Sequence, residues 1–99
     1  MYLVRETFIA KPGHAGELAE LMAREMKTMK GFKGRIMLDM VAQYNTIVAE
    51  YEIENLAVFE RMMNEHRKQV QAQKQKRKKP HPYTEMYQTG KREIFRIIE

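Results

Sequence analysis

Residues 46–61, TIVAEYEIENLAVFER, change their hydrophobic pattern halfway along, and this change decides the fold. Over 46–53, apolar and polar side chains alternate with a period of two, which is typical of a strand with one buried face. Beyond Asn55, a favourable N-cap, apolar residues recur at helical spacing. The stretch therefore predicts a strand that leads directly into a helix.

Upstream of this stretch, the pattern predicts a strand, a helix and a second strand. Alternation over 2–11 indicates the first strand, which Pro12 and Gly13 end. Residues 14–30 carry a leucine and methionine stripe at helical spacing, which favours ordinary core over an adaptable ligand surface. Residues 35–44 alternate again, and a tight turn at Asn45 would make 35–44 and 46–53 an antiparallel hairpin.

Downstream, the second helix is expected to run along one apolar seam and then to project from the body. The seam consists of Leu56, Phe59, Met63, His66 and Val70. Residues 71–90 are expected to form a basic helix extension and a connecting loop, with 83–90 as a short turn or helix. The last strand is predicted over 91–98, with Arg92, Ile94, Arg96 and Ile98 on one face and Phe95 and Ile97 on the other.

The resulting order, β-α-β-β-α-β, predicts an α+β fold of the ferredoxin-like kind. Both helices would cover one face of a four-stranded antiparallel sheet. A length of 99 residues fits one domain, 1–99.

Composition excludes several kinds of chemistry. The chain has no Cys, which excludes disulfides and thiolate catalysis, and it contains no Ser nucleophile for a Ser-His-Asp hydrolase. The three His have no metal-binding spacing, and no glycine-rich phosphate-binding motif occurs. We therefore expect neither a metal nor a cofactor.

Charge and hydropathy bear on location and partners. There is no apolar run of membrane-spanning length, and the start of the chain, with Arg5 and Glu6, does not resemble a signal peptide, so a cytoplasmic protein is expected. The net charge is +5, and the segment 74–79, KQKRKK, is densely basic. Such a segment binds nucleic acid or an anionic membrane, or is a solvated helix end. Few aromatic residues interleave with it to stack bases, which favours the helix end.

The face of the sheet away from the helices is expected to mix apolar and charged side chains. Its expected members are Leu3, Arg5, Ile9, Met37, Asp39, Val41, Val48, Glu50, Arg92, Ile94, Arg96 and Ile98. Because so apolar a face is unfavourable in water, its natural cover is the same face of a second copy. The predicted interface residues are Arg5, Asp39, Val48, Glu50 and Arg96. With the first strand between the third and fourth, Arg5 would reach Glu50. That pair would fix register, with a catalytic role as the alternative.

Two sequence features resemble a known family. They are the opening strand running into Lys11-Pro12-Gly13 and Glu17-Leu18, and the segment 50–53, EYEI, running into Leu56, Phe59 and His66. In these the chain resembles the dimeric α+β-barrel superfamily, in particular antibiotic-biosynthesis-monooxygenase-like and NIPSNAP-like domains. The resemblance implies pairing of two ferredoxin-like sheets into a barrel.

The resemblance also implies a cleft between the sheet and the helices. The residues expected to line it are Val4, Glu6, Phe8, Tyr44, Tyr51, Phe59, Met63 and His66, with Tyr83 and Tyr87 over its mouth. Some members of the family oxidise aromatic polyketides without metal or flavin. Others degrade haem with a His, a Trp and an Asn. His66 matches that His, but the chain has no Trp and Glu6 stands roughly where the Asn would be.

Glu6, Tyr51 and His66 are the candidate catalytic residues. An imidazole titrates near neutrality and suits proton abstraction, a buried carboxyl has a raised pKa, and a tyrosine orients a substrate oxygen. The hypothesis is a cofactor-independent monooxygenase-like enzyme acting on a small aromatic or quinone-like molecule. The alternative is a non-catalytic module that binds a small ligand or a partner, in which these side chains only pack. Nucleic-acid binding through 74–79 is a weaker alternative.

Overall fold

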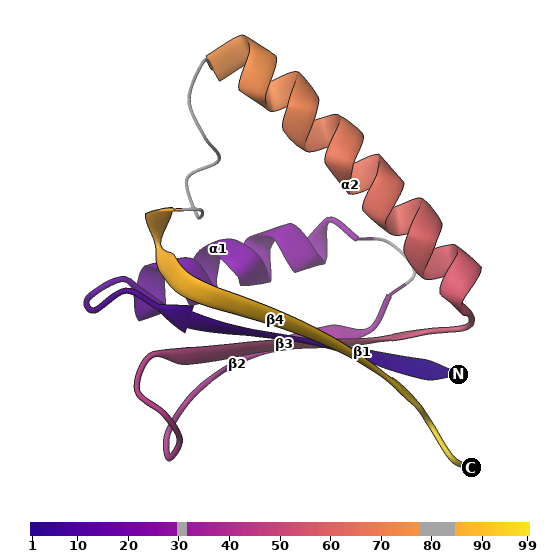
Figure 1. The fold of residues 1–99 in the computed structure, drawn as a ribbon, viewed down its shortest axis with the longest axis horizontal. Coiled ribbons are helices and arrows are strands. Elements are labelled where there is room, and N and C mark those ends of the chain that lie inside the picture. Colours follow the sequence, from indigo (N-terminus) through magenta and orange to yellow (C-terminus); the bar gives the residue numbers. More distant parts are fainter. Residues whose placement is uncertain (30–31, 78–84) are drawn as a thin grey trace.

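The described part of the protein folds as a sheet with two helices on one side (Figure 1). The computed structural model describes residues 1–29, 32–77 and 85–99, without the side chains of 73–77. In chain order, the elements are β1 (Tyr2–Ala10), α1 (Ala15–Lys27), β2 (Gly34–Leu38), β3 (Thr46–Ile53), α2 (Leu56–Arg77) and β4 (Tyr87–Arg96). The predicted order of elements is confirmed.

The four strands form one antiparallel sheet in the order β2-β3-β1-β4. This topology is compatible with the predicted ferredoxin-like fold. The central pair, β1 and β3, is in register from Tyr2 opposite Ile53 to Ile9 opposite Thr46. Because opposed residues of an antiparallel pair share a face, this register places Val4, Glu6, Phe8 and Tyr51 on the side of the helices.

Two apolar clusters form the core under the helices. One consists of Val4, Tyr51 and Ile53, with Phe59 and Met62 of α2 packed against it. The other consists of Ala10, Leu18 and Ile47, against which Met22 of α1 packs. The stripe predicted over 14–30 therefore faces the sheet, as expected for an amphipathic helix.

The second strand is shorter than predicted, because it ends at Leu38 instead of continuing to Tyr44. The Asp39 Oδ1 accepts a hydrogen bond from the backbone N–H of Thr46, 3.0 Å away, and the Thr46 hydroxyl donates to the Gln43 carbonyl at 2.6 Å. Asn45 adopts a φ of 64°, a conformation that asparagine tolerates. These local bonds close a wide connection, in which Met40, Val41 and Tyr44 are 95%, 98% and 86% exposed.

The last strand begins at Tyr87, so residues 87–90 belong to the sheet and not to a turn. Its two faces are also the reverse of those predicted. Arg92, Ile94 and Arg96 lie opposite Glu6, Val4 and Tyr2 on the helix side, while Phe95 lies opposite Leu3 on the other face. Arg96 is therefore not on the proposed interface. Both phases of this strand carry apolar residues, so only its pairing with β1 decides the face.

The second helix begins as predicted but stands away from the sheet. The Asn55 Oδ1 caps it by accepting a hydrogen bond from the Val58 N–H at 3.0 Å. From there α2 runs obliquely away from the strands (Figure 1). Leu56 and His66 are exposed, so the expected continuous apolar seam is not packed along its length. Neither described helix is long and apolar enough to cross a membrane.

Candidate functional site

Because α2 runs away from the sheet, a groove remains between α1, α2 and the sheet. This helix-side groove has a volume of about 1380 Å³. Its lining includes Met22 and Met26 of α1, Met29 just beyond the end of α1, and Met62 and Met63 of α2, together with Phe8 and Ile36 of the sheet. Methionine side chains are flexible and polarisable, so such a wall adapts to apolar ligands of different shape.

The lining also contains charged and polar residues of the helices, and a charge pair that belongs to the sheet. The Arg92 guanidinium donates to the Glu6 Oε1 across β1 and β4, with both Nε and an Nη atom 2.6 Å from that oxygen. The same guanidinium lies over the Phe59 ring of α2, 5.4 Å from its centroid. Arg92 therefore joins two strands to the second helix, with Glu6 neutralising its charge.

Tyr51 lies beside this pair, with its side chain buried and its ring lining the groove. Its hydroxyl has no hydrogen-bond partner among the described residues. Burial raises the pKa of the Tyr51 phenol well above its usual value, the Glu6 carboxylate raises it further, and Arg92 acts in the opposite direction. The phenol is therefore neutral at physiological pH and can donate a hydrogen bond.

The three predicted catalytic residues all line the groove, but they do not form a relay. Glu6 is paired with Arg92, and no hydrogen bond between described residues joins Glu6, Tyr51 and His66. His66 is exposed on α2. The arrangement thus supports positioning of a ligand oxygen by Tyr51 more directly than proton abstraction by His66.

The predicted ligand-binding residues divide into three groups. Phe8, Met63 and Tyr87 line the groove, and the Phe8 and Tyr87 rings meet edge to face at 5.0 Å. Val4 and Phe59 pack in or against the core instead. Tyr44 lies in the exposed connection after β2, so it is not part of the site, and Tyr83 lies outside the described residues.

Among the methionines of the groove, only Met63 was predicted as a site residue, and Arg92 was not predicted to line the groove. Arg92 was assigned to the wrong face because the phase of β4 was read from an ambiguous pattern. The methionine stripe on the first helix was visible in the sequence, but only the stand-off of α2 leaves part of it facing a groove.

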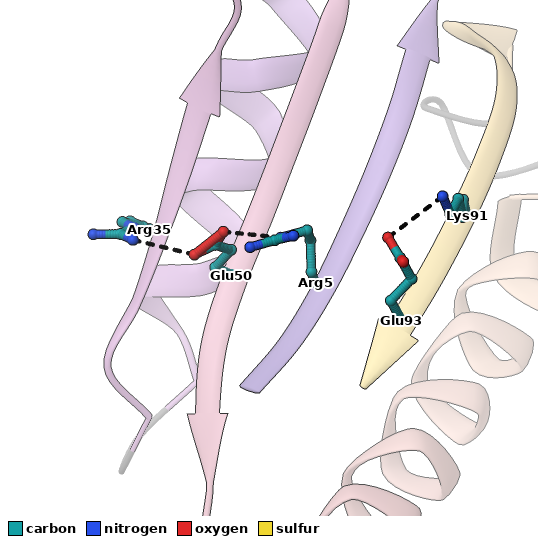
Figure 2. A network of polar contacts seen from close by, with 5 residues as sticks. All are labelled: Arg5, Arg35, Glu50, Lys91 and Glu93. Atoms are coloured by element: carbon teal, nitrogen blue, oxygen red, sulfur yellow. Dashed lines mark hydrogen bonds and ion pairs between the residues drawn. The ribbon is translucent and has the colours of Figure 1, made fainter. Parts of the chain in front are cut away.

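The face of the sheet away from both helices, here called the open face, carries a row of charges across all four strands (Figure 2). Arg35, Glu50, Arg5 and Glu93 are register partners, so their charges alternate in sign. The Glu50 carboxylate accepts from the Arg5 Nε at 3.0 Å and from an Arg35 Nη at 3.1 Å. Glu93 pairs instead with Lys91 at 3.5 Å, and Arg5 also lies over the Phe95 ring.

The other predicted interface residues are placed differently. Val48 lies on the open face, half-buried, opposite Thr7 and Met37. Asp39 is engaged in the connection that follows β2. The Arg5–Glu50 contact expected from the strand order is present.

Within the described ranges, no group of three His, Asp or Glu side chains lies close enough together to hold a metal ion. Comparisons with protein-family models, with curated proteins and with solved structures found no match to this chain.

Proposed function

We propose that the protein is a homodimer that binds a small aromatic molecule in the helix-side groove of each protomer. Two surfaces of the described fold are left uncovered. One is the open face, whose charges are self-complementary, and the other is the helix-side groove, which has methionines in its walls and a charge pair on its floor. The observation that supports binding is the separation of α2 from the sheet, because it leaves Phe8 and five methionines lining the helix-side groove. Pairing of two such sheets would give the dimeric α+β barrel that the sequence resembles.

The charge row favours a second copy as the cover of the open face. A two-fold axis parallel to the strands, passing between β3 and β1, reverses the strand order of the facing sheet. Arg35 of one protomer would then face Glu93 of the other, and Glu50 would face Arg5. Every charge in the row thus meets its opposite, which fixes register and orientation in aligned sheet packing.

The dimer is tested by sedimentation equilibrium. A monomer has a mass of 11.8 kDa, and we expect twice this value at micromolar concentration. Val48→Arg should weaken association about 100-fold or more, because it places an unpaired charge in the centre of the interface. Tyr44→Arg adds the same charge at an exposed site off the face and should leave association unchanged. A monomeric wild-type protein would refute the dimer.

Binding in the groove is tested with N-phenyl-1-naphthylamine, a neutral probe that fluoresces in apolar surroundings. The chain has no Trp, so intrinsic emission interferes little. We expect saturable enhancement, which Met63→Lys should weaken at least about tenfold by placing a charge in the apolar wall. Ile98→Lys adds the same charge at a site that is 85% exposed and outside the groove, and should have no effect. Enhancement that is absent, or unchanged by Met63→Lys, would exclude this site.

A second candidate is monooxygenase-like activity on an aromatic or quinone-like molecule, which the resemblance implies. The observation that favours it is that His66, Tyr51 and Glu6 line one groove. Oxygen consumption with a panel of phenols and hydroquinones tests it, and His66→Ala should abolish turnover while leaving probe binding intact. Turnover that survives His66→Ala would remove His66 from the reaction.

A further inference from the structure

The buried hydroxyl of Tyr51 is unusual because its burial is not compensated. Tyr51 is 3% exposed, and its hydroxyl has no partner among the described residues. Buried polar groups in native proteins are almost always hydrogen-bonded, since an unpaired one costs free energy. Tyr51 also lines the groove, so the missing partner can come from a bound molecule.

Two of the side chains that pack against the Tyr51 cluster also border the groove. Met26 and Met62 pack against the cluster that contains Tyr51, and both also line the groove. Thioether side chains change rotamer easily, so we infer that rotation of Met26 and Met62 would open the route from the groove to the buried hydroxyl.

The charges nearby select the kind of oxygen that can bind. Arg92 is the cation that acts on the Tyr51 phenol, and its guanidinium is already paired with Glu6. The other cations that line the groove, Arg24, Arg61 and Lys68, belong to the helices. Glu6 lies two positions from Tyr51 along the paired strands and on the same face. It acts on the phenol more strongly than Arg92 does. An anionic oxygen at the Tyr51 hydroxyl would therefore lie near the Glu6 carboxylate, whose repulsion the Arg92 guanidinium, already paired with Glu6, offsets only in part.

We propose that the groove selects an uncharged aromatic molecule with a carbonyl oxygen, and that the Tyr51 hydroxyl donates a hydrogen bond to this oxygen. The Glu6–Arg92 pair makes the floor polar but neutral, and thereby disfavours carboxylates of the same shape. This inference rests on the proposed binding function and adds to it the chemical class of the ligand.

The test compares three naphthalenes of similar size as competitors of N-phenyl-1-naphthylamine: 2-acetylnaphthalene, 2-isopropylnaphthalene and 2-naphthoate. Wild-type protein should bind the ketone about tenfold more tightly than the hydrocarbon, as expected for one hydrogen bond, and should bind the carboxylate most weakly. Tyr51→Phe removes only the hydroxyl. It should bring the ketone to the affinity of the hydrocarbon while leaving the hydrocarbon unchanged.

A second variant tests the charge selection without altering Tyr51. Glu6→Gln leaves Arg92 without its carboxylate, and should tighten 2-naphthoate binding at least about tenfold with little change for the ketone. The inference is overturned if the ketone and the hydrocarbon bind equally to the wild type. It is also overturned if Tyr51→Phe preserves their ratio, as it would if a water molecule satisfied the hydroxyl, or if Glu6→Gln does not favour the carboxylate. In each of those cases, displacement of the probe would still support ligand binding in the groove. Failure to bind the probe at all would remove both that proposal and the selection of a carbonyl ligand.

Discussion

The Arg5 guanidinium and the Glu50 carboxylate form a hydrogen-bonded ion pair across β1 and β3, with Nε and Oε1 3.0 Å apart, on the open face (Figure 2). Glu50 is only 7% exposed although neither described helix covers that face. Arg5 and Arg35 shield it from both sides, so the sheet buries a carboxylate under its own arginines. Removing one partner of such a buried ion pair lowers the stability of the fold, because it leaves the remaining charge uncompensated.

Glu50→Gln should lower the free energy of unfolding by about 1–2 kcal/mol, because two guanidinium groups lose their shared counter-charge. The cost stays below that of a fully buried pair, since the side chains of Arg5 and Arg35 are 39% and 70% exposed. Urea unfolding followed by circular dichroism measures the change.

Glu93→Gln provides the control on the same face. Glu93 pairs with Lys91, whose side chain is 68% exposed, and such a pair contributes less than about 1 kcal/mol. Equal losses in the free energy of unfolding for the two variants would show that Glu50 contributes no more to stability than the exposed Glu93.

The central strands and the Arg5–Glu50 pair were predictable because their determinants are local or repeat with a strict period. Residues 46–53 alternate without ambiguity, Asn55 is followed by a helical pattern, and the strand order then brings Arg5 to Glu50. A period of two assigns every side chain to a face once one face is apolar.

The errors arose where the pattern fits two structures. Residues 39–44 continue the alternation of β2, but the hydrogen bonds that Thr46 donates to Asp39 and Gln43 close a connection instead. In β4 both phases carry apolar residues, so its face depends on pairing with a strand at the other end of the chain, as the separation of 86 between Glu6 and Arg92 illustrates. The polar floor of the groove was therefore not predictable from local sequence.

Gly34→Ala should destabilise the protein by about 1–2 kcal/mol. A Cβ at this position would meet the Met26 Sδ and would lie 3.1 Å from the Glu50 carbonyl oxygen, which the sheet holds in place. The variant also disturbs the methionine wall beside Tyr51, so probe binding should weaken together with stability. The midpoint of urea unfolding and the fluorescence titration measure the two effects.

Gly16→Ala is the matched control. Among the described residues, no atom apart from its chain neighbours and the backbone of its own helix lies within 4 Å of the Cβ it would add, and Gly16 is in the first turn of α1. It should stabilise the protein by up to about 1 kcal/mol through the lower entropy of the unfolded chain. A loss of stability here would mean that the chain does not tolerate even an unobstructed methyl group.

Arg92 and Phe59 should be energetically coupled, because the guanidinium over the ring links β4 to α2. A double-mutant cycle of Arg92→Gln and Phe59→Leu should give a coupling of about 0.5–1 kcal/mol. The hydrogen bond to Glu6 is lost in both variants that carry Arg92→Gln, so its contribution cancels in the coupling energy. A parallel cycle of Glu6→Gln and Phe59→Leu should be close to additive, and additivity in both cycles would mean that Arg92 does not hold the helix.

Tyr51→Phe should leave the free protein as stable at neutral pH as the wild type, or more stable by up to about 1 kcal/mol, because it removes a buried hydroxyl that lacks a partner.

The effect of Tyr51→Phe on stability should depend on pH. The pKa of Tyr51 is raised in the folded state, so above pH about 10 the folded protein retains a proton that the unfolded chain has released. This term therefore lowers the free energy of unfolding of the wild type as pH rises, and Tyr51→Phe abolishes it. Urea unfolding at pH about 7 and about 10.5 should show the advantage of Tyr51→Phe growing with pH. Tyr44→Phe, at an exposed site, should show no such growth. An advantage that is independent of pH would mean that the Tyr51 phenol titrates normally, and a loss of stability at neutral pH would mean that the hydroxyl already has a partner in the free protein.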